Sequence, residues 1–144
     1  MSLGSTWNIA KQIKNQICLN WNEVTNIQRQ RVSENATLTA HLNGESVFIR
    51  VTPAWHRGIA QLVSEAAIIN ELASLNVPVA KPIPSLNGQM ICTALVEKNK
   101  GEFQQYFIMV FTACTGKHLR GDQIWSDDIV YECGRLLAKL GVVA

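Results

Sequence analysis

An Asn-Gly pair between two β-prone runs is the feature that most restricts the fold of this chain. Asn43-Gly44 separates runs near 36–42 and 46–51. Such a pair favours the tight turn of a two-residue β-hairpin, because both residues tolerate a positive φ. The sequence therefore predicts two antiparallel strands here, preceded by a third strand near 26–32.

A helical pattern follows this hairpin. Apolar residues recur every three or four positions, which is the spacing of one buried helix face: Ile59, Leu62, Val63, Ala66, Ile69, Leu72 and Ala73. Asn76-Val77-Pro78 then indicates a stop, since Asn accepts a left-handed cap and the residue before a proline resists helical geometry. We expect a helix from about Arg57 to Leu75.

The remaining elements are predicted from weaker signals. Ser5 or Thr6 is a candidate cap for an amphipathic N-terminal helix that carries Trp7, Ala10, Ile13 and Ile17. Lys81–Pro84 is extended and limited by its prolines, Asn87-Gly88 is a second turn, and strands are expected at about 89–96 and 105–111 with a hairpin loop at 97–102. Ser126, followed by two aspartates, begins a last helix that Gly141 would end.

The order of these elements predicts an α+β fold. We expect a five-stranded, largely antiparallel sheet with a packed helix, plus an N-terminal helix and a C-terminal helix that follows a linker. The chain has 144 residues, of which 47% are apolar and 17% charged, so it can bury one core of ordinary size.

Charge and cysteine use exclude several classes of protein. The net charge is +2 and the 13 Lys and Arg residues are scattered, which argues against a nucleic-acid or membrane partner. The four cysteines and three histidines lack the spacing of a zinc site, so we expect reduced, mostly buried thiols. No signal peptide or spanning segment is visible, and a cytoplasmic location is expected.

Several short segments in a fixed order resemble a known family. They are Ser33-Glu34-Asn35-Ala36, Val47–Val51, Ser64–Ala67 with Glu65, Val77–Pro84, Asn87-Gly88, Phe107–Phe111, Thr115-Gly116 and Gly134–Leu140. In this order they resemble the N-terminal lobe of the aminoglycoside phosphotransferase and choline kinase-like family, which shares the protein kinase fold. The resemblance implies a nucleotide-binding lobe over residues 1–114, and over 115–144 a linker and the first helix of a C-terminal lobe.

One charged pair stands out within that resemblance. Alternation places Arg50 on the same strand face as Phe48, and a buried guanidinium needs a partner. Glu65, at the edge of the apolar helix stripe, is the natural candidate. The resemblance implies that Arg50 contacts the α and β phosphates of ATP and that Glu65 orients it, although many relatives have lysine there. A solvent-facing Arg and an unrelated Glu form the alternative.

Two further groups of nucleotide contacts follow from the resemblance. Ser33 and Asn35 would offer a hydroxyl, an amide and backbone N–H groups to the phosphates, unless the segment is an ordinary polar hairpin. Thr112, Ala113 and Cys114 would form the hinge whose backbone recognises adenine. Ile49, Val51 or Met109 are candidates to pack on the ring, or are simply core. An incidental thiol is the simplest interpretation of Cys114.

The implied function is that of the ATP-binding lobe of a small-molecule kinase. The family pattern requires a His soon after Leu140, then acids for magnesium, but the chain reads Gly141-Val142-Val143-Ala144. We therefore expect Mg²⁺ only in a complete enzyme, no catalysis by these residues alone, and an unknown small-molecule phosphate acceptor. The alternatives are a non-catalytic module that binds or self-associates through exposed lobe surface, as a homo-oligomer, and an unrelated α+β domain.

Overall fold

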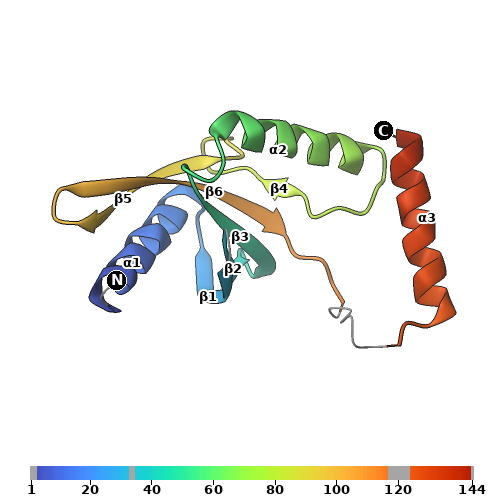
Figure 1. Ribbon diagram of the computed structural model, residues 1–144, viewed down its shortest axis with the longest axis horizontal. Helices are drawn as coiled ribbons and strands as arrows, with labels where there is room; N and C mark the ends of the chain where they lie inside the picture. The colour runs from blue at the N-terminus through green and yellow to red at the C-terminus, as the bar shows by residue number, and fades with distance from the viewer. Residues whose placement is uncertain (1–2, 33–34, 117–123, 144) are drawn as a thin grey trace.

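A single sheet with a helix on each of its faces forms most of the structure (Figure 1). The computed structural model describes residues 3–32, 35–116 and 124–143. These residues form, in chain order, α1 (Leu3–Asn20), β1 (Val24–Val32), β2 (Ala36–Leu42), β3 (Glu45–Pro53), α2 (Ile59–Ser74), β4 (Pro82–Ile83), β5 (Cys92–Asn99), β6 (Glu102–Thr112) and α3 (Asp127–Val143).

The sheet is antiparallel at every strand pair of the described residues, in the order β1-β2-β3-β6 with β4 and β5 beyond β6. The predicted α+β architecture is confirmed, with six strands in the described chain in place of five. The extra strand is β4, which has two residues because prolines flank Ile83 and cannot donate to a ladder. Since β4 and β5 pair with different parts of the same β6 edge, they share one position in the sheet.

The predicted hairpin is confirmed at the turn between β2 and β3. Asn43 has a φ of 51° and Gly44 a φ of 84°, the left-handed values that a two-residue turn of this class requires. Leu42 faces Glu45 directly across the turn. This turn fixes the register of β2 on β3, and so fixes which side chains share a face.

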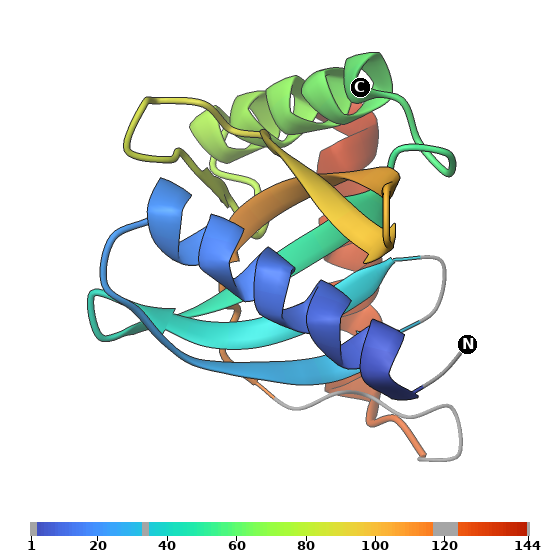
Figure 2. The ribbon, with the colours of Figure 1, turned by 90° about the vertical axis from the view of Figure 1, so that its left-hand side faces the viewer.

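The first face of the sheet is closed by α1, as Figure 2 shows. The buried residues of this face are Ile13, Ile17 and Trp21 from the α1 region, Ala40, Val47, Ile49 and Val51 from β2 and β3, and Cys92, Ala94, Val96, Ile108 and Val110 from β5 and β6. In β3, β5 and β6 these buried residues alternate along the strand, as expected when one face of a sheet packs on a helix.

Side-chain hydrogen bonds fasten α1 to the sheet edge. The Gln12 side-chain amide donates to the Glu97 carbonyl at 3.0 Å and accepts from the Glu97 N–H at 3.0 Å. It therefore makes the two backbone hydrogen bonds at the edge of β5 that a neighbouring strand would otherwise make. Trp21, which is 2% exposed, donates from Nε1 to the carbonyl of Ile83 in β4 at 3.1 Å. The position of α1 is therefore fixed by polar contacts as well as by packing.

The second face is covered by α2 over only part of its area. Leu62 and Ala66 are buried against Phe107, Met109 and Phe111 of β6. The apolar face predicted for α2 is too wide: Ile59 and Val63 are 50% and 54% exposed. Part of the apolar pattern of α2 therefore stays at the surface, where Ile59 and Val63 line a shallow pocket with Met90 and Ile91.

The predicted end of α2 is confirmed. Asn76 has a φ of 58° and donates its N–H to the Ala73 carbonyl, while the Val77 N–H donates to the Leu72 carbonyl. These two bonds form a Schellman cap with Asn at the left-handed position. The cap turns the chain sharply back toward β4.

Several predicted boundaries differ from the structure. The expected loop at 97–102 is mostly strand, because β5 and β6 continue to a turn at Lys100-Gly101. Helix α1 begins at Leu3, before the proposed caps, and α3 continues past Gly141. Ser126 does cap α3, since its hydroxyl accepts from the Ile129 N–H.

The four thiols are free, but the prediction that most are buried is wrong. Cys18 and Cys114 are exposed, Cys133 is half-buried, and Cys92 alone among them is buried. Burial raises the pKa of the Cys92 thiol, which makes it a poor nucleophile. Among the described helices, none is long and apolar enough to cross a bilayer.

Replacing Gln12 with Met should destabilise the fold by about 1–3 kcal/mol, because the N–H and carbonyl of Glu97 would lose their partner at a half-buried edge. Chemical denaturation of the two proteins measures this difference. Gln16→Met is the matched control, since Gln16 is half-buried on the same helix and its side chain makes no hydrogen bond to β5 in the described structure. Equal stability of the two variants would contradict the role given to Gln12.

Candidate functional site

Strand register gathers a polar and aromatic cluster on the second face of the sheet. Thr37 of β2 faces Arg50 of β3, and Arg50 faces Met109 of β6. In the adjacent row Phe48 faces Phe111. Side chains directly opposite in an antiparallel pair lie on the same face, so these five residues share one surface.

Arg50 is held by three different kinds of contact. Its Nη1 donates to Glu65 Oε1 at 2.7 Å, its Nη2 lies 3.2 Å from the Met109 sulfur, and its guanidinium carbon lies 5.2 Å from the centre of the Phe111 ring. The side chain is 21% exposed. Its Nε is buried and has no hydrogen-bond partner among the described residues. Arg50 therefore keeps donor capacity beyond the contacts that fix it.

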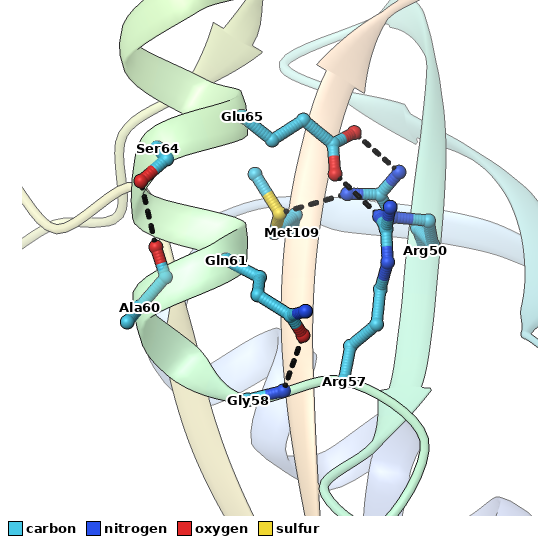
Figure 3. A network of polar contacts seen from close by, with 8 residues as sticks. All are labelled: Arg50, Arg57, Gly58, Ala60, Gln61, Ser64, Glu65 and Met109. Atoms are coloured by element: carbon cyan, nitrogen blue, oxygen red, sulfur yellow. Dashed lines mark hydrogen bonds and ion pairs between the residues drawn. The ribbon is translucent and has the colours of Figure 1, made fainter.

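Glu65 is shared between two arginines, as Figure 3 shows. Arg50 approaches one carboxylate oxygen, and Arg57 donates from Nη1 to the other at 2.7 Å. Arg57 precedes α2, and its side chain is 42% exposed. Two guanidinium charges against one carboxylate leave the cluster one positive charge in excess.

The environment of Glu65 sets its protonation state. Burial raises the pKa of this carboxyl, but the hydrogen bonds and charges of Arg50 and Arg57 outweigh burial and hold the pKa below its ordinary value. Glu65 is therefore ionised at neutral pH. An ionised Glu65 keeps the guanidinium of Arg50 in a fixed orientation.

A cleft of about 430 Å³ opens beside this cluster. It is lined by Thr37, Phe48, Ile49, Arg50, Glu65, Ile69, Val79, Ala80 and Phe111. A mostly apolar lining with a few convergent polar groups is typical of small-molecule sites. The candidate site is thus an apolar cleft with a cation at one side.

Of the two residues predicted to contact phosphate from the segment between β1 and β2, the structure describes only Asn35. Ser33 lies outside the described residues. Asn35 is half-buried, and its Oδ1 has no hydrogen-bond partner in the described part of the chain. Ile49 and Val51, suggested as ring contacts, are both buried in the core against α1, and of the two only Ile49 also lines the cleft, together with Phe48 and Phe111.

The predicted hinge residues begin with Thr112, the last residue of β6. The Thr112 N–H donates to the Lys81 carbonyl at 2.9 Å, and the Ala113 N–H donates to the Ser46 carbonyl at 3.3 Å. The Thr112 hydroxyl accepts from the Lys81 N–H at 2.9 Å. Within the described residues, the Cys114 N–H has no partner, and Cys114 is exposed. Of the three hinge N–H groups, that of Cys114 is therefore the one open to a ligand.

Sequence reasoning missed Arg57 and Phe111 as parts of the site. Arg57 lies in a turn where its N–H reaches the Pro53 carbonyl, and no periodicity predicts the direction of a loop side chain. Phe111 was predicted only as part of an apolar strand, although its register opposite Phe48 follows once β3 and β6 are paired. No group of three or more His, Cys, Asp or Glu side chains that could hold a metal occurs among the described residues.

Comparison with known proteins identifies the fold. No protein-family model matches the chain. Amicoumacin kinase of Bacillus subtilis (strain 168) is 26% identical over 108 residues, which cover 75% of this chain and 31% of that protein. A solved amicoumacin kinase in complex with AMP-PNP and Ca²⁺ matches with a TM-score of 0.66 at 17% identity, over 84% of this chain and 36% of that one. The fold is that of a protein kinase-like N-terminal lobe.

A second solved structure agrees with this lobe. Spectinomycin phosphotransferase, in complex with ADP and spectinomycin, matches with a TM-score of 0.64 at 14% identity, over 93% of this chain and 38% of that chain. The resemblance to the aminoglycoside phosphotransferase group that the sequence suggested is confirmed for the N-terminal lobe. The chain spans about a third of the length of each of these relatives.

The lowered pKa of Glu65 predicts a pH-dependent contribution to stability. Because the folded-state pKa lies below the unfolded value of about 4.3, this contribution is complete above that pH and is lost as the pH falls through the folded pKa. Glu65→Gln should lower the free energy of unfolding by about 1–3 kcal/mol at pH 7. The difference from the parent should shrink below about pH 4.

Urea denaturation of both proteins between pH 7 and pH 3 measures this difference. Glu71→Gln is the control, because Glu71 lies exposed on the same helix. A gap between parent and Glu65→Gln that stays constant down to pH 3 would show that the charge of Glu65 does not stabilise the fold.

Proposed function

We propose that this chain is the ATP-binding lobe of a small-molecule phosphotransferase, of the kind that transfers the γ-phosphate of ATP to a hydroxyl group when complete. The observation that carries the proposal is the Arg50 and Glu65 ion pair inside an apolar cleft that reaches Phe111, next to the hinge. An ionised carboxylate that orients a strand cation is how kinase-like folds hold nucleotide phosphates. The fold and the nucleotide complexes of both solved neighbours support it.

In this proposal each part of the cleft has a separate task. Arg50 donates to the α and β phosphates with the N–H groups that Glu65 does not use, and its planar fork suits phosphate oxygens. Asn35 and Ser33 contact the phosphates from the adjacent segment. The free N–H of Cys114 contacts adenine at the hinge, alongside hinge carbonyls of Thr112 and Ala113, while Phe48 and Phe111 pack near the ring.

The metal and the phosphate acceptor are assigned to residues beyond this lobe. Among the described residues, no group of three or more acidic, His or Cys side chains is placed to hold Mg²⁺. We infer a small molecule with a hydroxyl group as acceptor, by analogy with the antibiotic complexes of the neighbours. A boundary near residue 114 between lobe and linker, and a cytoplasmic location where ATP is available, belong to the same proposal.

A second function, a non-catalytic module that self-associates, is favoured by α3. This helix carries the exposed apolar residues Val130, Tyr131, Leu137 and Val142. Within the described residues, its polar contact to the lobe is a hydrogen bond from Lys139 Nζ to the Asn76 carbonyl at 2.7 Å. Exposed apolar residues in one region favour contact between copies. Sedimentation at increasing concentration tests this function, and a monomer throughout would refute it.

Arg50→Ala should weaken ATP binding about tenfold or more, because hydrogen bonds from a charged donor to phosphate are lost. Calorimetric titration of the purified chain with ATP measures the effect. Arg135→Ala is the matched control: Arg135 forms an exposed ion pair with Glu132 on α3, so the same charge is removed elsewhere. Equal ATP affinity in the parent and Arg50→Ala would refute the proposed phosphate site.

The 144 residues alone should bind ATP without transferring phosphate. The reason is that positioning of the acceptor and the metal supplies most of the rate in this chemistry, and the described residues hold no metal cluster. Incubation with labelled ATP and candidate hydroxyl acceptors tests this expectation. Turnover above background would show that the chain contains a catalytic group in addition to the nucleotide-binding residues of the cleft.

A further inference from the structure

We infer that Arg57 is a positioning residue of the phosphate site, which holds the second oxygen of Glu65 so that Glu65 stays on Arg50 while an anionic phosphate occupies the cleft. This inference rests on the proposed function. It adds to the ion pair of Arg50 and Glu65 a third residue, which comes from the turn before α2. Figure 3 shows both guanidinium groups at the one carboxylate.

The backbone of Arg57 is fixed at the junction of two elements. The N–H groups of His56 and Arg57 reach the Pro53 carbonyl at the end of β3, at 3.0 and 3.4 Å. The next residue, Gly58, caps α2, and its N–H donates to Gln61 Oε1 at 3.0 Å. Arg57 is therefore anchored both to the strand that carries Arg50 and to the helix that carries Glu65.

The charges explain why a second arginine is needed. A polyphosphate beside Arg50 would repel the ionised carboxylate of Glu65 and compete with it for the same guanidinium. With Arg57 on its other oxygen, Glu65 keeps a paired charge when phosphate draws on Arg50. The pair of Glu65 and Arg57 is neutral, so the charge of Arg50 remains available to the ligand.

Alternative roles for Arg57 lead to different results. A purely structural ion pair would alter stability without altering the preference for ATP over adenosine. If Arg57 contacted the phosphate directly, changing Arg57 would weaken ATP binding whether or not Glu65 is charged. A positioning role acts through Glu65, so the effect of changing Arg57 should vanish once Glu65 is neutral.

The test is a double-mutant cycle with ATP and adenosine as ligands, measured by calorimetry on the whole chain. Arg57→Gln should weaken ATP binding about fivefold, the size expected when a partly exposed ion pair is lost, and should leave adenosine binding unchanged. In the Glu65→Gln background, Arg57→Gln should have no further effect. Arg135→Gln, which removes an exposed ion pair on α3, should change neither ligand.

Each remaining outcome decides against the inference. Unchanged ATP affinity in Arg57→Gln, an equal loss for adenosine, or a full loss that persists in the Glu65→Gln background would overturn it. If the wild type does not prefer ATP to adenosine, the proposed function fails and this inference fails with it. If Arg57→Gln does not fold, Arg57→Lys is used, and it should weaken ATP binding by less than fivefold because it keeps the charge but not the guanidinium fork.

Discussion

The ion pair between Arg50 and Glu65 is the interaction on which the arrangement of the cleft depends. It joins the central strand β3 to α2 across a face of the sheet that the helix covers only in part. Removing two charges from water is costly unless each finds several partners. Here Arg50 also contacts Met109 and Phe111, and Glu65 also contacts Arg57. The cluster therefore fixes the position of α2 and keeps a cation in the wall of the cleft.

The two faces of the sheet differ because successive side chains of β3 point to opposite faces. Its residues Val47, Ile49 and Val51 point into the core that α1 closes, and Phe48 and Arg50 point into the cleft. The closed face gives the strand a rigid support, which Gln12 and Trp21 strengthen by fastening α1 to the sheet edge. Packing on one face of the sheet therefore holds the side chains on the other face in fixed positions.

The predicted hinge segment, Thr112 to Cys114, shows how backbone hydrogen bonds limit the groups that remain free for a ligand. Two of its three N–H groups already donate to carbonyls of neighbouring segments, at Lys81 and Ser46. The first bond holds the residue before β4 against the end of β6, and the second ties the chain after β6 to the start of β3. A ligand at the hinge must therefore use the Cys114 N–H or a carbonyl. Among the described residues, the same bonds that stabilise the sheet leave the Cys114 N–H as the unused N–H donor of this segment.

The sequence by itself determined the local elements of this protein: the Asn43-Gly44 turn, the helix α2 with its Asn76 cap, and the face of β3 on which Arg50 lies. These depend on backbone preferences and on residue spacing within one element, which are visible in a linear chain. Tertiary structure alone decided that Arg57 reaches Glu65, that Phe111 lies over Arg50, and that β4 and β5 share one edge. Contacts of this kind join residues from different elements, so they depend on strand register and on the path of loops, and neither follows from periodicity.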